Sequence, residues 1–293
     1  MTILEREFNE LLLRLEPRGR NTLPVTRYRN SVHNALKGHM PVRDVMVVGS
    51  HARGTMIAPI SHADIDMLVV LDAGTNVPEG NATLFLESMR GLLISLSPKL
   101  LRIDEKLQGI SVPFPPVRLD VIPAFIRKEG GYCIPDPKTK QWMVSDPEQH
   151  TTGILAADRQ QSGRLLPLIR IIKTWNMLRG YPFEPFYLEL LAVWFFGAII
   201  IEDYPSALSY FFKKGIREST RAVKDPAADG GFVHGFRAVR RSQDAVDHFT
   251  EAYKRTENAA TLVAGNLLPR AVSEWRKLFG SYFPSTVPGF IGR

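Results

Sequence analysis

Residues 45–71, VMVVGSHARGTMIAPISHADIDMLVVL, decide how this chain folds. An apolar run at 45–48 that is rich in β-branched residues ends at Gly49, and a second apolar run begins directly after Asp66. Short apolar runs bounded by turn residues are typical of buried β-strands. Glycine lets the backbone approach a ligand closely, and Ser50 offers a hydroxyl and an N–H group to phosphate oxygens. The stretch therefore predicts a strand, a glycine-serine turn, a short helical crossing and a second strand.

Two carboxylates open the second predicted strand. Asp64 and Asp66 are two residues apart, so in a strand they point to the same face while Ile65 points into the core. Carboxylates held side by side repel each other unless a cation lies between them. An oxygen-rich pair suits Mg²⁺, which takes few protein carboxylates and keeps positions for water and substrate phosphates. This strand therefore predicts a site for a divalent metal and a phosphate group.

A third carboxylate lies in the apolar run VRLDVI at 117–122. Asp120 is costly to bury there unless it is paired or bound to metal, and it is the candidate third ligand if two metals are held. The alternative is a glycine-serine turn with surface carboxylates that cap a strand. That alternative is disfavoured, because both aspartate blocks continue directly into apolar strand-like segments.

The ordered set of Gly49-Ser50, Asp64-x-Asp66 and Asp120 resembles the DNA polymerase β-like nucleotidyltransferase superfamily. The fuller wording GSHARGT, ADIDMLVVL and RLDVIPAF is similar to the bacterial cyclic-dinucleotide synthases of anti-phage signalling, relatives of cyclic GMP-AMP synthase and oligoadenylate synthase. The resemblance implies an α+β fold, with a short mixed β-sheet flanked by helices as the catalytic core and a helical domain after it. It also implies two Mg²⁺ ions, with Mn²⁺ as an alternative, held by the three aspartates.

Two further candidate residues lie in the second half of the chain. The wording IIKTWN at 171–176 resembles a family helix whose lysine contacts the donor triphosphate, which gives that role to Lys173. The alternative is a solvated lysine on an amphipathic helix. Tyr187 matches a family aromatic that stacks on a base, and the alternative is ordinary core packing. Pro185-Phe186 departs from the family at the selectivity position, so the base identity stays open.

The expected organisation is a catalytic core with N-terminal helices at 1–146 and, from 147–293, a helical domain that completes the nucleotide-binding cleft. Asp146-Pro147 is the expected boundary between them. Apolar periodicity predicts helices at eight places. They are residues 2–16, 26–37, 82–96, 159–179, 186–202, 205–216, 242–257 and 259–279.

Composition adds bounds on the function. The chain has 293 residues, of which 44% are hydrophobic, and its net charge of +7 favours an anionic partner such as nucleotides, nucleic acid or a membrane surface. A single cysteine, Cys133, excludes an internal disulfide and fits a reducing cytoplasm. Charges spread over residues 1–21 argue against a signal peptide. The longest apolar run, 190–201, is too short to span a bilayer and predicts a buried helix.

Three functions remain open at this point. The favoured one is a cytoplasmic, Mg-dependent synthase that joins ATP and a second nucleoside triphosphate into a cyclic di- or trinucleotide for anti-phage signalling. It would release pyrophosphate, need no nucleic acid, and work either alone or after release by a regulatory partner protein. The second is a transferase that adds nucleotides to RNA or modifies a protein or small molecule on the same core. The third is a catalytically silent binding protein, which the presence of all three aspartates disfavours.

Overall fold

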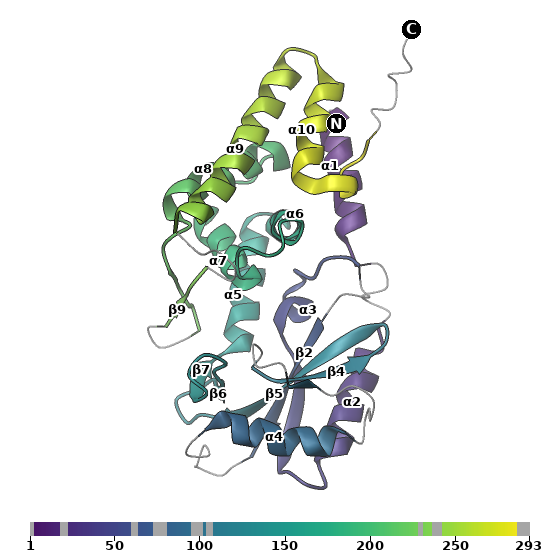
Figure 1. The fold of residues 1–293 in the computed structure, drawn as a ribbon, viewed down its shortest axis with the longest axis vertical. Helices are drawn as coiled ribbons and strands as arrows, with labels where there is room; N and C mark the ends of the chain where they lie inside the picture. The colour runs from purple at the N-terminus through teal and green to yellow at the C-terminus, as the bar shows by residue number, and fades with distance from the viewer. Residues whose placement is uncertain are drawn as a thin grey trace. The chain divides into compact units, whose positions relative to one another are not determined.

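The computed structural model of this chain describes most of its length. The described residues are 3–17, 23–59, 64–72, 81–94, 102–103, 108–227, 231–235 and 242–285. They divide into two compact units (Figure 1). The sheet unit consists of Pro17–Gly153 and Pro226–Gly231. The helical unit consists of Met1–Glu16, Ile154–Asp225 and Phe232–Arg293.

This division differs from the expected one in two respects. The boundary falls between Gly153 and Ile154, inside a helix, and not at residue 146. The first helix, α1 (Ile3–Leu15), groups with the helical unit and not with the catalytic core. Its buried side chains explain the grouping, because Phe8, Leu11 and Leu15 join the hydrophobic cluster of that unit.

The sheet unit contains a mixed β-sheet, which confirms the predicted fold class. Among the described residues the sheet has seven strands, ordered β1-β2-β5-β4-β3, with β6 paired to β5 and β7 paired to β6. Strands β2 and β5 are parallel, and the other neighbouring strands are antiparallel. The strands are β1 (Val42–Val47), β2 (Asp64–Leu71), β3 (Arg102–Ile103), β4 (Ile110–Phe114), β5 (Val117–Ile126), β6 (Tyr132–Pro135) and β7 (Trp142–Ser145).

The two faces of this sheet bury different residues of β2. Its odd-numbered residues, from Ile65 to Leu71, join one hydrophobic cluster with α2 (Val25–Leu36) and α4 (Ala82–Leu93). The even-numbered residues after the aspartates belong to a second cluster on the opposite face. This alternation is the period-2 pattern of a strand. Asp64 and Asp66 are even-numbered, so they lie on the face that α2 and α4 do not cover.

The helical unit packs its helices around one aromatic-rich core. Its helices are α1, α5 (Pro147–Gln160, which begins in the sheet unit), α6 (Leu165–Met177), α7 (Pro185–Phe195), α8 (Tyr204–Glu218), α9 (Ser242–Ala264), α10 (Leu268–Phe279) and the 3₁₀ turn Gly280–Tyr282. Strand β8 (Val223–Lys224) pairs with β9 (Phe232–Val233) in a separate, two-stranded antiparallel sheet. Within the described ranges, every helix is too short or too polar to cross a membrane.

Several predicted helix boundaries were wrong. The predicted helix 159–179 is two helices, α5 and α6, because the chain turns at Ser162 and Gly163 with positive φ. The predicted helix 186–202 ends at Phe195, and the apolar residues that follow include the exposed Ile200. The break predicted at residue 258 is absent, since α9 runs on to Ala264. Residues 95–96 of the predicted helix 82–96 lie outside the described residues.

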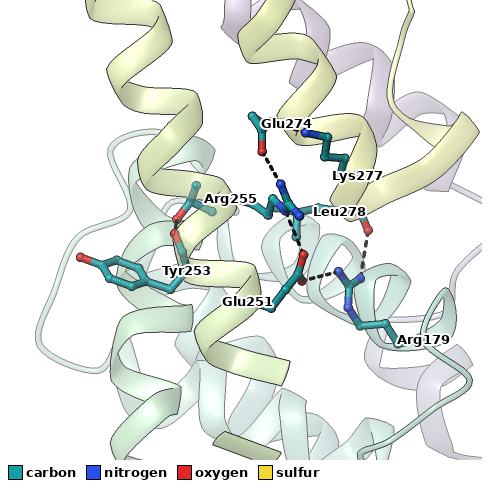
Figure 2. Close-up of polar contacts among 8 residues, drawn as sticks. Arg179, Glu251, Tyr253, Arg255, Glu274, Lys277 and Leu278 are labelled. Atoms are coloured by element: carbon teal, nitrogen blue, oxygen red, sulfur yellow. Dashed lines mark hydrogen bonds and ion pairs between the residues drawn. The ribbon is translucent and has the colours of Figure 1, made fainter. Parts of the chain in front are cut away.

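Ion pairs and hydrogen bonds connect three helices of the helical unit (Figure 2). Arg179, just after α6, donates to Glu251 on α9 at 3.0 Å and to the carbonyl of Leu278 on α10 at 3.2 Å. Arg255 donates both to Glu251 at 2.9 Å and to Glu274 on α10 at 3.1 Å. The guanidinium groups thus connect α6, α9 and α10 through charge-assisted hydrogen bonds.

Candidate functional site

The strand register brings the three predicted aspartates together in the sheet unit. In the parallel pair β2–β5, Asp66 is the register partner of Asp120, and Asp64 is the partner of Arg118. Partners in adjacent strands point to the same face, so all three carboxylates lie on one side of the sheet. Asp64 and Asp66 are half-buried, whereas Asp120 is only 4% exposed.

Asp120 is oriented by a hydroxyl from the neighbouring strand. Ser111 on β4 is its register partner on that side, and its hydroxyl donates to Asp120 Oδ1 at 2.5 Å. Ser111 is itself buried, so this bond lies in a poorly solvated environment. A buried carboxylate is costly unless it is hydrogen-bonded or paired, and Ser111 supplies part of that compensation.

Arg118 lies between two of the aspartates. Its Nη2 donates to Asp64 Oδ2 at 2.8 Å, and its Nε lies 3.5 Å from Asp120 Oδ1. Alternation along β5 explains the position, because Arg118 is two residues before Asp120 and shares its face. The guanidinium therefore offsets part of the repulsion between the gathered carboxylates.

Gly49 packs directly against Asp66. Its φ is +68°, and a Cβ added there would lie 1.7 Å from Asp66 Oδ2, so no side chain fits without displacing the carboxylate. The backbone N–H of Val48 donates to the carbonyl of Asp66 at 2.9 Å. The predicted short crossing is α3 (Gly49–Arg53), and Ser50 is its second residue. The glycine-serine turn and the carboxylates thus form one continuous local arrangement.

These residues fit a Mg²⁺ site in their chemistry. The donors are carboxylate oxygens, which Mg²⁺ prefers, and the register places them side by side. Among the described residues, however, no three histidine, cysteine, aspartate or glutamate side chains stand in an arrangement able to hold a metal ion. The contacts of Arg118 are consistent with this, since Asp64 and Asp120 are engaged by its guanidinium.

Lys173 lies in the helical unit and is not a solvated surface residue. It is 7% exposed, and its Nζ donates to Glu189 Oε1 at 2.9 Å. Glu189, on α7, is fully buried. The alternative reading of Lys173 as a solvated lysine is therefore wrong, because both the side chain and its partner are buried.

The expectation that Tyr187 stacks on a base does not hold in this structure. The residue is 0% exposed, and a Cβ added at Gly235 would lie 2.4 Å from the tyrosine ring. Its hydroxyl donates to the carbonyl of Arg221 at 2.8 Å, with the carbonyl of Ser219 at 3.2 Å. Burial, followed by the nearby charge of Glu218, raises the pKa of the phenol. Tyr187 is therefore a buried core residue that contacts Ser219, Arg221 and Gly235.

Three residues of these arrangements were missed in the sequence. Arg118 could have been found, because a residue two before Asp120 must share its strand face. Glu189 was detectable as the one charge in the apolar run 185–196. Ser111 had no local signal, since only the pairing of β4 with β5 brings it to Asp120.

Comparison with known proteins decides the family. Residues 1–156 match the family model described as the Second Messenger Oligonucleotide or Dinucleotide Synthetase domain, which is more than half of the 293-residue chain. The chain belongs to this family. Membership of the second-messenger synthetase family confirms the predicted resemblance and the prediction that the chain is a nucleotidyltransferase.

Relatives of this synthetase-family chain cover nearly its whole length. A cyclic AMP-AMP-AMP synthase from Acinetobacter is 24% identical over 96% of the chain and 85% of the relative. The solved structure of Escherichia coli MS115-1 CdnC with ATP has a TM-score of 0.73, is 18% identical, and covers 96% of this chain and 98% of that one. Vibrio cholerae DncV is a cyclic AMP-GMP synthase whose structure was solved with the linear intermediate pppA(3′,5′)pG. Its TM-score is 0.66 at 15% identity, and the match covers 82% of this chain and 70% of DncV. These likenesses confirm the polymerase β-like fold.

Proposed function

We propose that this protein is a Mg-dependent synthase of a cyclic di- or trinucleotide second messenger, built from ATP and a second nucleoside triphosphate in the cytoplasm as a signal in anti-phage defence. The observation that carries the proposal is the register that pairs Asp66 with Asp120 beside Asp64, against the glycine at position 49. Family membership and the names of the relatives support the cyclic product.

The proposed reaction is a series of nucleotidyl transfers, two for a cyclic dinucleotide and three for a cyclic trinucleotide. In each, a ribose hydroxyl oxygen bonds to the α-phosphorus of a triphosphate while the bond from that phosphorus to the β-phosphate oxygen breaks. The hydroxyl proton is lost and pyrophosphate leaves with the electron pair of the broken bond. The last transfer, between the two ends of the linear product, closes the ring. The linear pppA(3′,5′)pG intermediate bound by DncV supports this order of events for the present chain.

Each residue of the site has a proposed part in this chemistry. Asp64, Asp66 and Asp120 are the residues that would hold Mg²⁺ (two ions, with Mn²⁺ able to replace them). When bound, the metal lowers the pKa of the attacking hydroxyl and offsets charge on the phosphates. The Gly49-Ser50 turn presents its backbone N–H groups and the Ser50 hydroxyl to phosphate oxygens. Lys173 adds a positive charge for the triphosphate.

Regulation by a partner protein is the remaining part of the proposal. Escherichia coli MS115-1 CdnC has been solved in a complex with a HORMA protein, and that complex motivates the suggestion that this chain also has a protein regulator. The enzymatic test therefore has a second condition, in which a HORMA protein is added to the same mixture.

The deciding experiment incubates the purified protein with radiolabelled nucleoside triphosphates and Mg²⁺ or Mn²⁺, then treats the products with phosphatase. A small phosphatase-resistant product, identified as cyclic by mass spectrometry, is the expected result. Label that enters only added RNA, a protein or a small molecule would assign the alternative transferase activity. A product that keeps a terminal triphosphate before phosphatase treatment would contradict ring closure.

A further inference from the structure

Lys173 and Glu189 form an ion pair inside the helical unit. The Nζ–Oε1 distance is 2.9 Å, with the lysine side chain 8% exposed and the glutamate side chain 0% exposed. Lys173 lies on α6 and Glu189 on α7. The residues around them in sequence, 171–176 on α6 and 187–192 on α7, are all buried. The glutamate is therefore shielded from water, whereas the lysine keeps a small exposed fraction.

Stability does not account for such a pair. Removing two charges from water is expensive, and replacing a buried ion pair by well-packed apolar residues is often neutral or stabilising. The two helices already contribute buried apolar side chains, Ile172 and Leu188 among them, to one hydrophobic cluster. The presence of a charged pair at this position therefore indicates a functional role for one of the two charges, such as binding a ligand.

The scaffold around the pair is rigid. Three residues after Lys173 on α6, the Asn176 side chain donates to the Phe183 carbonyl at 2.8 Å and accepts from the Phe183 N–H at 3.1 Å. These two bonds fix the chain just before α7 against the end of α6. Asn176 is itself fully buried, so the bonds are sheltered from water. The carboxylate of Glu189 is thereby held at a set place relative to Lys173.

A fixed carboxylate changes what the lysine can do. A free lysine side chain has four rotatable carbon–carbon bonds and loses much freedom when it binds a ligand. An opposite charge nearby favours the protonated form of a buried amine, and a hydrogen bond to one of its three N–H donors sets its direction. The ammonium is therefore charged and oriented before a ligand arrives.

We propose that Glu189 is a positioning residue for Lys173, which it holds in place to bind the triphosphate of an incoming nucleotide. The proposal rests on the proposed function, because it needs a nucleotide substrate. Glu189 itself touches no substrate and acts only through the lysine. The chemical class of the ligand is an anionic polyphosphate, for which a compact ammonium serves as a point charge.

The test separates binding from folding. The double variant Lys173→Met with Glu189→Leu replaces both charges by apolar groups, so we expect its melting temperature to be unchanged. Its affinity for the nucleotide should be about ten- to hundredfold lower, because a charge-assisted hydrogen bond to the triphosphate is lost. Affinity is measured by calorimetry with a non-hydrolysable triphosphate and Mg²⁺. In Glu189→Gln we expect KM for the triphosphate to rise more than kcat falls. Lys173→Ala and Lys173→Ala with Glu189→Gln should have equal affinities, because Glu189 acts only through Lys173.

Glu251→Gln is the matched control. It breaks an ion pair to Arg179 in the same unit, so it should lower the melting temperature and leave KM unchanged (Figure 2). Wild-type affinity in the folded Lys173→Met, Glu189→Leu protein would overturn the positioning role while leaving the proposed function intact. Wild-type protein that neither binds nor converts nucleotides would overturn the proposed function and this inference with it.

Discussion

Asp66 on β2 and Asp120 on β5 lie directly opposite each other in a parallel pair of strands. The two aspartates are far apart in sequence, because α4, β3 and β4 lie between the strands that carry them. Parallel pairing with this register places both side chains on the face that the α2 and α4 helices leave uncovered. A one-residue slip of β5 would turn Asp120 to the opposite face. The register is therefore what assembles the candidate site.

Replacing Asp64 and Asp66 together by asparagine should abolish nucleotidyl transfer, with a loss of at least about a hundredfold in kcat. The fold should survive, because the apolar residues of β2 that form the two hydrophobic clusters do not include either aspartate. Product formation and far-ultraviolet circular dichroism check the two halves of this prediction. Full activity in the folded double variant would remove both aspartates from the site.

Replacing Arg118 by alanine should raise the affinity for Mg²⁺ or Mn²⁺ by about two- to fivefold, as expected for removal of a competing, half-exposed ion pair. Without metal the variant should melt at a lower temperature, since the carboxylates lose their counter-charge. Calorimetric titration with Mn²⁺ measures the affinity. Arg29→Ala, which breaks the exposed pair to Asp44 in the same unit, is the control and should not change it. A weaker metal affinity in Arg118→Ala would show that the guanidinium supports metal binding.

Replacing Gly49 by alanine should reduce activity strongly, because the added methyl group displaces the Asp66 carboxylate. We expect a stability loss of about 1–3 kcal/mol from overpacking. The control is Gly91→Ala on α4, where a Cβ would meet nothing within 4 Å. That change should stabilise the protein by about 0.5–1 kcal/mol, because alanine is the better helix former. Urea denaturation and product formation measure both variants, and an active Gly49→Ala enzyme would contradict the close packing.

Replacing Tyr187 by phenylalanine should lower the free energy of unfolding by about 1–3 kcal/mol, because the buried hydrogen bond to the Ser219 carbonyl and the part-buried one to the Arg221 carbonyl are lost. KM for the nucleotide should stay close to that of the wild type. Denaturant unfolding decides the matter. An exposed, base-stacking tyrosine would instead tolerate this change with no loss of stability.

The network in Figure 2 predicts an acid-sensitive helical unit. Burial alone would raise the pKa of Glu251, but hydrogen bonds from Arg255 and Arg179 outweigh it and lower that pKa below its ordinary value of 4.5. A lowered folded-state pKa contributes stability above about pH 4.5 that is lost as the pH falls through the lowered value. Melting temperatures between pH 3 and pH 7 should therefore fall more steeply for wild type than for Glu251→Gln. Parallel curves would show that the network contributes no pH-dependent stability.

The local patterns of the sequence determined the strands, the turn and two of the three site aspartates. Asp64 and Asp66 were placed together because the period of a strand is two residues, a property of the backbone that needs no tertiary information. The same reasoning predicted α1, α2 and the short crossing at Gly49-Ser50, since apolar periodicity and turn residues act over a few positions. The resemblance to the family predicted that Asp120, the third aspartate, belongs to the same site, although the sequence did not show which strands pair.

Tertiary structure alone decided what surrounds those residues. Ser111 reaches Asp120 only through the β4–β5 pairing, and Arg118 takes its position between two carboxylates only through the β2–β5 register. The sequence left Tyr187 open between core packing and base stacking, and Lys173 open between a solvated position and triphosphate contact. Gly235 lies against the ring of Tyr187, and Glu189 on α7 accepts a hydrogen bond from Lys173 on α6. Both contacts join residues that are distant in sequence. Whether a side chain faces solvent or another element is set by contacts distant in sequence, which is why the chemistry of the site was predictable and its environment was not.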